Sequence, residues 1–345
     1  MNKFANRLLV LMAFFALCSC SEKQAKLVFD ENGEFKILQF TDLHYILHDS
    51  RSDIMLERVE EMLNIEKPDL VVITGDLVYA PPADSAYIDI LSRIAAHNVP
   101  FAVAFGNHDD NWDKTNAELY DLMQTLPGCI MPPAEKGRCG DYTLEIYSHD
   151  GKKLEEVLYC IDTHSYDYDY KEYMRINASQ VDWYYTTSQA YTKQNGGQPV
   201  PSMLFLHIPF PEYNDKLPYT GFWGESVCCP VINSGMFNTI LDCGDVKAVF
   251  CGHDHNNDYA MDNRGILLAY GRYTGGDTVY NDIPNGARVI LLKENTNIFS
   301  TWVTLKGGER IDYLEHKRYL IIDFFQGRGK ISGVGGFNEV KLNLE

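Results

Sequence analysis

Short apolar segments of strand length alternate with longer amphipathic segments over residues 35–250, and this alternation restricts the folds open to the chain. The apolar segments are rich in β-branched and aromatic residues, as buried strands are. The longer segments begin near Ser, Thr or Asp, and several end near Gly or Pro, as helices do. Strands are expected at 35–40, 69–74, 99–105, 157–161, 203–206 and 246–250, and helices at 53–66, 85–98, 115–126, 179–194 and 234–243.

Strands that alternate with helices imply crossover connections and mostly parallel pairing. After Gly265 the pattern changes to successive strands, which predicts antiparallel pairing at 266–270, 287–292, 300–305 and 319–325. The expected fold class is therefore α/β: a layered α/β/β/α sandwich of two mixed sheets flanked by helices. Because the sequence has no internal repeat and no long low-complexity linker, we expect one structural domain over residues 35–345.

The first residues have the composition of a secretory signal. Lys3 and Arg7 precede an apolar run that extends from Leu8 to Leu17, which is too short to span a bilayer because spanning needs about 20 residues. The sequence at 17–20, Leu-Cys-Ser-Cys, resembles the bacterial lipobox. This resemblance implies a signal over 1–20, a lipid on Cys20 and a tether over 21–34, and hence an exported lipoprotein attached to the membrane, periplasmic or on the cell surface. The alternative is a plain cleaved signal whose cysteines have no role.

The formal net charge of -18 bears on possible partners. A negative long-range field repels polyanions, so we expect no nucleic acid polymer as a partner. A small phosphate ester is not excluded, since bound divalent cations would be the largest local charges. No protein partner is inferred.

The cysteines beyond Cys20 are odd in number, which argues against a complete disulfide framework. Cys129 and Cys139 flank a Pro/Gly-rich loop and could pair in an oxidising compartment, whereas Cys160 and Cys251 lie in apolar runs and are expected in the core.

Side chains that can bind metal ions follow five of the predicted strands. In α/β sheets the carboxyl ends of the strands line one crevice, so these side chains can converge. Residues two apart in an extended segment point the same way, which suits the D-x-H and H-x-H spacings. Imidazole, carboxylate and amide ligands without thiolate suit Mn, Fe, Zn or Ni. Because the candidates exceed the four ligands of a structural zinc site, we expect two ions. The candidate ligands are Asp42, His44, Asp76, Asn107, His207, His253 and His255.

The ordered motifs D-x-H, G-D, G-N-H-[DE], H and G-H-x-H resemble those of the calcineurin-like metallophosphoesterase superfamily, over roughly residues 35–306. Residues 207–213, 233–235, 244–247 and 252–258 further resemble the purple-acid-phosphatase-like branch found in bacteria, fungi and plants. The resemblance implies one ion held by Asp42, His44, Asp76 and His255 and a second held by Asp76, Asn107, His207 and His253, with Asp76 as the bridge.

The resemblance also implies a metal-dependent phosphoesterase that hydrolyses phosphomonoesters by attack of a metal-bridging hydroxide. His108 would stabilise the transition state or protonate the leaving oxygen, and Asp109 would orient His108 or raise its pKa. Purple acid phosphatases bind iron through a tyrosinate in Gly-Asp-x-x-Tyr, which residues 75–79 match. Because His44 already supplies the fourth ligand, we expect Tyr79 to pack beside the ions.

Two other functions remain open: a phosphodiesterase acting on small nucleotides or lipid headgroups, and a non-catalytic metal-containing surface binding protein. The tyrosine-dense segment 164–191 is expected to contribute aromatic contacts at the mouth of the cleft, with 222–225 as a second wall. For Trp183 we expect packing of a helix on the sheet instead. His48 and His164 lie near motif-bearing loops and could touch substrate, although loop positions are the simpler reading.

Overall fold

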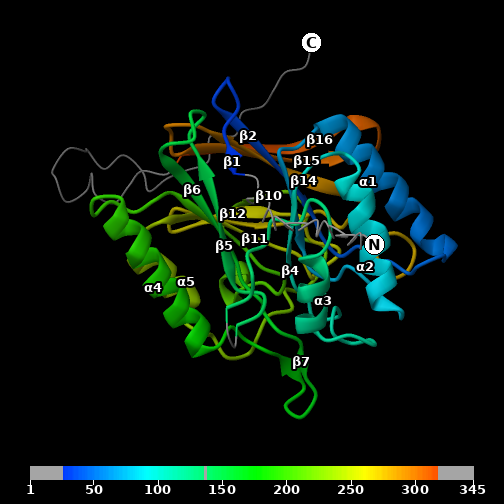
Figure 1. Ribbon diagram of the computed structural model, residues 1–345. Helices are drawn as coiled ribbons and strands as arrows, with labels where there is room; N and C mark the ends of the chain where they lie inside the picture. Colours follow the sequence, from blue (N-terminus) through cyan, green and yellow to red (C-terminus); the bar gives the residue numbers. More distant parts are fainter. Residues whose placement is uncertain (1–25, 136–137, 318–345) are drawn as a thin grey trace, which may run out of the picture.

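The computed structural model describes residues 26–135 and 138–317. Two mixed sheets lie at the centre, with helices α1, α2 and α3 on one side and α4 and α5 on the other (Figure 1). The helices are α1 (Asp53–Glu66), α2 (Ala83–Ala95), α3 (Asn116–Met123), α4 (Ala178–Gln194) and α5 (Met236–Cys243). This arrangement confirms the predicted α/β sandwich of two sheets flanked by helices.

The six-stranded sheet combines the first strands of the chain with the last described ones. Strands β2, β3 and β4 pair in parallel, and β14 joins the edge of β2 in the antiparallel direction. Strands β14, β15 and β16 then follow one another as antiparallel neighbours; the pattern after Gly265 predicted β14 and β15, but not β16. The order is β16 (Arg310–Lys317), β15 (Ile298–Leu305), β14 (Gly286–Lys293), β2 (Glu34–Phe40), β3 (Leu70–Thr74) and β4 (Phe101–Ala104).

The eight-stranded sheet has a parallel centre formed by β6, β9, β11 and β13. Its order is β1 (Leu27–Val28), β5 (Tyr142–Tyr147), β6 (Leu154–Cys160), β9 (Ser202–Phe205), β11 (Val246–Cys251), β13 (Ile266–Tyr270), β12 (Ala260–Asn263) and β10 (Tyr219–Thr220). A separate hairpin of β7 (Tyr166–Asp167) and β8 (Glu172–Tyr173) extends away from the body of the molecule, at the bottom of Figure 1.

Alternate residues of the central strands pack into two different hydrophobic layers, because successive side chains of a strand point to opposite faces. On β11, Phe250 stacks on Phe205 and contacts Phe299 of the six-stranded sheet, whereas Val249 and Cys251 pack in the cluster beneath α4 and α5. Such buried apolar layers fix the strand ends relative to one another.

Several elements differ from the sequence expectations. Strand β1 lies within the segment expected to be a tether and pairs with β5. The predicted strand at 266–270 forms β13, which pairs antiparallel with β12, as expected, but parallel with β11 on its other side, in the eight-stranded sheet. The strand expected at 319–325, the signal at 1–20 and Cys20 lie outside the described residues.

The described cysteines follow the expectations in part. Cys160 and Cys251 are buried in the core, as predicted. Cys129 and Cys139 are half-buried free thiols in the structure. No helix among residues 26–135 and 138–317 is long and apolar enough to cross a membrane.

Candidate metal centre

The predicted metal ligands lie together at the carboxyl ends of strands from both sheets. The ends of β2, β3 and β4 deliver four of them from the six-stranded sheet, and the ends of β9 and β11 deliver three from the eight-stranded sheet. All are buried. We call this set the ligand cluster: Asp42, His44, Asp76, Asn107, His207, His253 and His255.

One side of the ligand cluster is formed by Asp42, His44 and His255, whose ligand atoms lie within 4.8 Å of one another. The Nε2 atoms of His44 and His255 are 3.1 Å apart. Nε2 of His255 lies 3.6 Å from Oδ1 of Asp42. Two imidazoles and a carboxylate directed at one point can bind a divalent transition metal ion.

The other side of the ligand cluster is formed by residues around His207. Its Nε2 atom lies 3.0 Å from Oδ1 of Asn107 and 3.3 Å from Oδ2 of Asp76, and its ring centroid is 5.1 Å from that of His253. Oδ2 of Asp76 is also 3.7 Å from Nε2 of His44. Asp76 therefore lies between the two sides, where a carboxylate could reach both ions.

The hydrogen bonds of the cluster fit cations at its centre. His207 donates from Nδ1 to the carbonyl oxygen of Thr74 at 2.7 Å, and His255 donates from Nδ1 to that of Tyr280 at 2.8 Å. These bonds fix the Nδ1 proton of each ring and direct Nε2 inward, as in histidines that bind metal ions. Nδ1 of His44 and Nε2 of His253 are buried and have no hydrogen-bond partner among the described residues.

The charges of the cluster are also suited to a cation. Burial lowers the pKa of His44 and of His253 well below the usual value, so both rings are neutral and can act as ligands. Burial disfavours charge on His207 as well, but attraction from Asp76 outweighs it and raises the pKa of His207 to about 10. A proton is thus held beside the carboxylates at a place where a metal cation would compensate the same charge.

The backbone around the cluster is in conformations that side chains rarely adopt. Asp42, His44 and Asp76 have φ of 53°, 44° and 53°. At Gly75, with φ of +84°, an added Cβ would lie 2.6 Å from Gly106 and from Nδ1 of His207. Strained backbone of this kind occurs at functional sites, where the surrounding structure imposes it. Position 75 therefore requires glycine, since no larger residue fits between these two strand ends.

His108 lies at the edge of the cluster and is partly exposed. Its ring centroid is 5.8 Å from that of His44. Asn111 donates from Nδ2 to Nδ1 of His108 at 2.7 Å, which places the proton of the neutral ring on Nε2. His108 can therefore offer an N–H to an oxygen atom beside the ligand cluster. Sequence analysis missed Asn111, although its position three residues after His108, in a turn, was a usable signal.

The structure gives Asp109 other partners than those expected. Its carboxylate accepts hydrogen bonds from the backbone N–H groups of Asp76 (3.0 Å), Leu77 (2.9 Å) and Gly106 (2.7 Å), and from the hydroxyl of Tyr87 (2.7 Å). Asp109 therefore joins the loops after β3 and β4 and does not orient His108. Burial, with repulsion from Asp76, raises the pKa of Asp109 to about 6.

Tyr79 packs its ring edge-on against His44, at 5.0 Å between centroids, and against His108 at 5.5 Å. Trp112 supports the other side of Tyr79 at 5.6 Å. Tyr79 therefore packs against the ligand cluster, as expected from the sequence.

The tyrosine-dense segment divides as predicted into a loop part and a helix part. In the β7–β8 hairpin, the ring of Tyr173 meets His253 at 4.4 Å, and Tyr166 meets Tyr173 and Tyr168 at 5.2 Å each. On α4, Trp183 packs on Tyr159 at 6.2 Å, as expected for a helix on the sheet. His164 bonds to Gln180 through Nε2 and is a loop residue, and His48 is exposed.

Tyr280 was not singled out by the sequence, because no motif marks its loop. Its ring stacks on His255 at 4.6 Å and its hydroxyl donates to Glu225 at 3.0 Å. Glu225 belongs to the second predicted wall, and its carboxylate also accepts from the backbone of Asn256 at 2.6 Å. We call Tyr166, Tyr168, Tyr173 and Tyr280 the aromatic wall.

Comparisons with known proteins agree with this geometry. The family model for calcineurin-like phosphoesterases matches residues 35–257. A protein of Arabidopsis thaliana named probable inactive purple acid phosphatase 29 is 30% identical, over 91% of this chain and 92% of its own length. Phosphatase DCR2 of Saccharomyces cerevisiae is also 30% identical, over 81% of this chain and 55% of its own length.

Among solved structures, a dimetal phosphatase from Danio rerio superposes with a TM-score of 0.57. The superposition covers 83% of this chain and 99% of that protein, at 13% sequence identity. At this identity the likeness supports the fold alone.

Proposed function

Because this chain belongs to the calcineurin-like phosphoesterase family, we propose that it hydrolyses phosphomonoesters at a dinuclear metal site formed by the ligand cluster. The observation that carries the proposal is the position of His108. Its ring lies beside the ligand cluster, with a protonated Nε2 set by Asn111. A site that only stored metal ions would not need a hydrogen-bond donor at its edge.

In the proposed reaction the protein contributes fixed groups. Asp42, His44, Asp76 and His255 would hold one ion, and Asp76, Asn107, His207 and His253 the other. When bound, the two ions would supply positive charge that neutralises the phosphoryl oxygens and lowers the pKa of water. His108 would donate a hydrogen bond from Nε2 to the ester oxygen and stabilise the negative charge that develops on this oxygen as it leaves. Asp109 keeps the loops that carry Asp76 and Asn107 at a fixed separation.

Two alternatives follow from the names of relatives. The Arabidopsis thaliana protein is named as inactive, and a relative in Psychrobacter arcticus, 24% identical, is named a probable cyclic nucleotide phosphodiesterase. The partly exposed His108, with its hydrogen bond from Asn111, supports catalysis over metal storage. The net charge of -18 disfavours substrates with several phosphates.

The test is hydrolysis of p-nitrophenyl phosphate and of bis-p-nitrophenyl phosphate by the full chain loaded with Mn²⁺. We expect faster turnover of the monoester. Faster turnover of the bis ester would instead assign a phosphodiesterase, and absence of turnover with Mn²⁺, Fe²⁺ or Zn²⁺ in a folded, metal-loaded protein would favour the binding protein.

We also propose that the chain is exported and held at a membrane by a lipid on Cys20. The support is the run from Leu8 to Leu17 followed by Leu-Cys-Ser-Cys at 17–20. Metabolic labelling with a tagged fatty acid in a bacterial host should label the full chain. Cys20→Ser should remove the label, and Cys18→Ser should keep it. Equal labelling of both variants, or labelling of neither the parent nor the variants, would contradict the anchor.

A further inference from the structure

The two sides of the ligand cluster are supported by different kinds of structure. On one side, Nδ1 of His207 donates to the carbonyl oxygen of Thr74, the last residue of strand β3. On the other side, Nδ1 of His255 donates to the carbonyl oxygen of Tyr280, which lies in the loop 271–285 between β13 and β14. A strand is fixed by its ladder of hydrogen bonds, whereas a loop is fixed by individual contacts. The support of His255 therefore depends on the contacts that hold this loop.

Side chains hold the middle of the loop. Residues 278–283 make no backbone–backbone hydrogen bond with another segment in the described part of the chain. Nδ2 of Asn256 donates to Oδ2 of Asp282 at 3.0 Å, and the backbone N–H of Asp282 donates back to Oδ1 of Asn256 at 2.6 Å. Because Asn256 directly follows His255 in the chain, this reciprocal pair joins the loop to the neighbour of the ligand that it supports.

Asn256 is itself held by the segment before it in the cleft wall. Its backbone N–H donates to Oε1 of Glu225 at 2.6 Å, and its carbonyl oxygen accepts from the backbone N–H of Gly224 at 3.0 Å. The side chain of Asn257 accepts from the backbone N–H of Glu225 at 3.1 Å and donates to the carbonyl oxygen of Glu225 at 3.2 Å. Oε2 of Glu225 also accepts from the hydroxyl of Tyr280 at 3.0 Å. The wall segment and the loop are therefore joined through Asn256 and Glu225.

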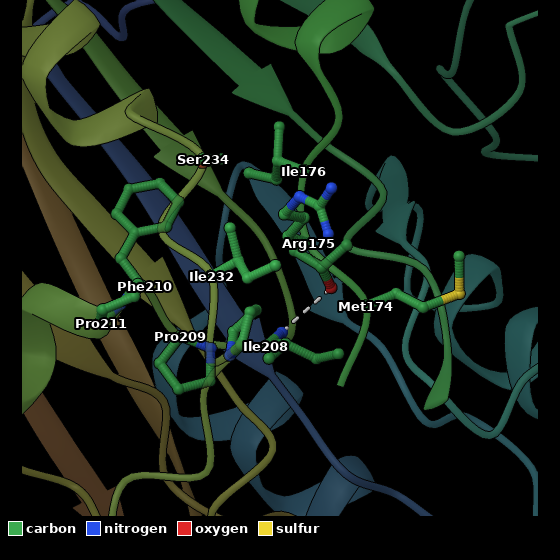
Figure 2. Close-up of a pocket in the computed structure, with 11 residues that line it drawn as sticks. Met174, Arg175, Ile176, Ile208, Pro209, Phe210, Pro211, Ile232 and Ser234 are labelled. Carbon is green, nitrogen blue, oxygen red and sulfur yellow. Dashed lines mark hydrogen bonds between the residues drawn. The ribbon is translucent and has the colours of Figure 1, made fainter. Parts of the chain in front are cut away.

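The wall segment is packed further along as well. Figure 2 shows Ile232 of this segment beside Ile208 and Phe210, which follow strand β9 and line the same small pocket. The free space in the pocket is about 10 Å³, which is room for about one water molecule. None of the residues that line it belongs to the ligand cluster, and it is too small for a substrate. The narrow gap instead shows close packing of the segment that supports Asn256.

We propose that Asn256 and Asp282 are positioning residues for His255. Their paired hydrogen bonds hold the carbonyl oxygen of Tyr280 at Nδ1 of His255. This oxygen keeps the proton of the neutral ring on Nδ1 and fixes the orientation of the ring, as the outer partners of metal-binding histidines do. Without the pair, the loop would move and the ring would be free to rotate or to take the other tautomer.

The proposal makes the two ion positions unequal. Nε2 of His255 faces Oδ1 of Asp42 at 3.6 Å, so a rotated ring would remove one ligand from the position that His44 and His255 would share. The position around His207 has its own support from a strand and would keep its affinity. This inference rests on the dinuclear site of the proposed function, but it does not depend on whether the site hydrolyses phosphomonoesters.

The test is calorimetric titration of the full chain with Mn²⁺ after resident metal has been removed with a chelator. The parent should bind two ions. Asp282→Ala should weaken one of them about tenfold or more, since loss of an outer partner costs about 10–100-fold in metal affinity, and should leave the other unchanged. Asp282→Asn keeps an oxygen that accepts from Asn256 and should stay close to the parent. Asp277→Ala is the matched control, because Asp277 is an exposed aspartate of the same loop and is held by its backbone N–H, which the substitution keeps.

His255→Ala identifies the ion concerned. It should abolish the binding step that Asp282→Ala weakens, and adding Asp282→Ala to His255→Ala should not change the affinity for the remaining ion. If Asp282→Ala leaves both affinities unchanged, or weakens the remaining ion in the His255→Ala background, the pair does not position His255 and the inference is wrong. A parent that binds fewer than two ions of Mn²⁺, Fe²⁺ or Zn²⁺ would instead overturn the proposed dinuclear site, and this inference with it.

Discussion

The ligand cluster and the aromatic wall are in contact, through Tyr173 with His253 and Tyr280 with His255, but are held in different ways. In the cluster, Nδ1 of His207 bonds to a backbone carbonyl, and the loops of Asp76 and Asn107 are joined by Asp109. The wall depends on contacts between rings, as between Tyr173 and His253, and part of it is exposed, with Tyr168 at 74%. Backbone bonds fix positions within tenths of an ångström, whereas ring contacts allow exchange of side chains. We therefore expect chemistry to depend on the cluster and selectivity to depend on the wall.

The largest effect is expected from Asp76→Asn, which removes the carboxylate between the two sides of the cluster. Loss of this charge should lower kcat/KM for p-nitrophenyl phosphate by at least about 10³-fold and should reduce bound metal. Metal content by plasma mass spectrometry is measured beside the rate. Asp121→Asn, an exposed position on α3, is the control and should behave as the parent. Full activity of Asp76→Asn would show that the reaction does not use the cluster.

His108→Ala should lower kcat by about 10²-fold or more for alkyl phosphates while the metal content stays unchanged. The loss should be smaller for p-nitrophenyl phosphate, because p-nitrophenolate delocalises its charge and needs less stabilisation from a hydrogen bond. Asn111→Ala, which frees the His108 ring, should show a weaker form of the same pattern. An equal loss for both kinds of substrate would mean that His108 stabilises charge on the phosphoryl group and not on the leaving oxygen.

Much of the fold could be predicted because the hydrophobic residues of its long helices and strands recur with a clear period. The helix expected at 53–66 has those bounds in the structure, and the core strands lie within a few residues of their predicted positions. The two-residue strands β1 and β10 are too short to show any period. The parallel pairing of β13 with β11 depends on packing across the sheet, which a local pattern does not encode.

The residues of the site likewise divide into those that the sequence could predict and those that it could not. The ligand cluster could be predicted, since each ligand directly follows a buried strand and strand ends converge. The role of Asp109 could not, because the choice between His108 and the backbone N–H groups depends on where the loop after β4 turns. Tyr280 reaches His255 from a loop without regular structure, and such closures are set by tertiary contacts.

Asp109→Asn tests whether the hydrogen bonds under the cluster fix its loops. An amide accepts fewer bonds than a carboxylate and places N–H groups against N–H donors, so the free energy of unfolding should fall by about 2–3 kcal/mol. Urea unfolding followed by circular dichroism measures this change. Asp110→Asn, at the exposed neighbouring position, should leave stability unchanged. If Asp109→Asn kept its stability but lost much of its kcat, Asp109 would act on His108, as the sequence predicted.

The smallest effect is expected in the aromatic wall. Tyr173→Leu removes the ring that lies edge-on to His253 and should raise KM for phenyl phosphate a few-fold, about the contribution of one aromatic contact. The value of kcat and the metal content should stay the same, because His253 keeps its place at the end of β11. Tyr173→Phe keeps the ring and should match the parent, and Tyr170→Leu, at a position 79% exposed in the same hairpin, should do so as well. A fall in kcat or in bound metal for Tyr173→Leu would show that the aromatic wall also holds the ligand cluster in place. The wall would then affect chemistry as well as selectivity, through its contact with His253.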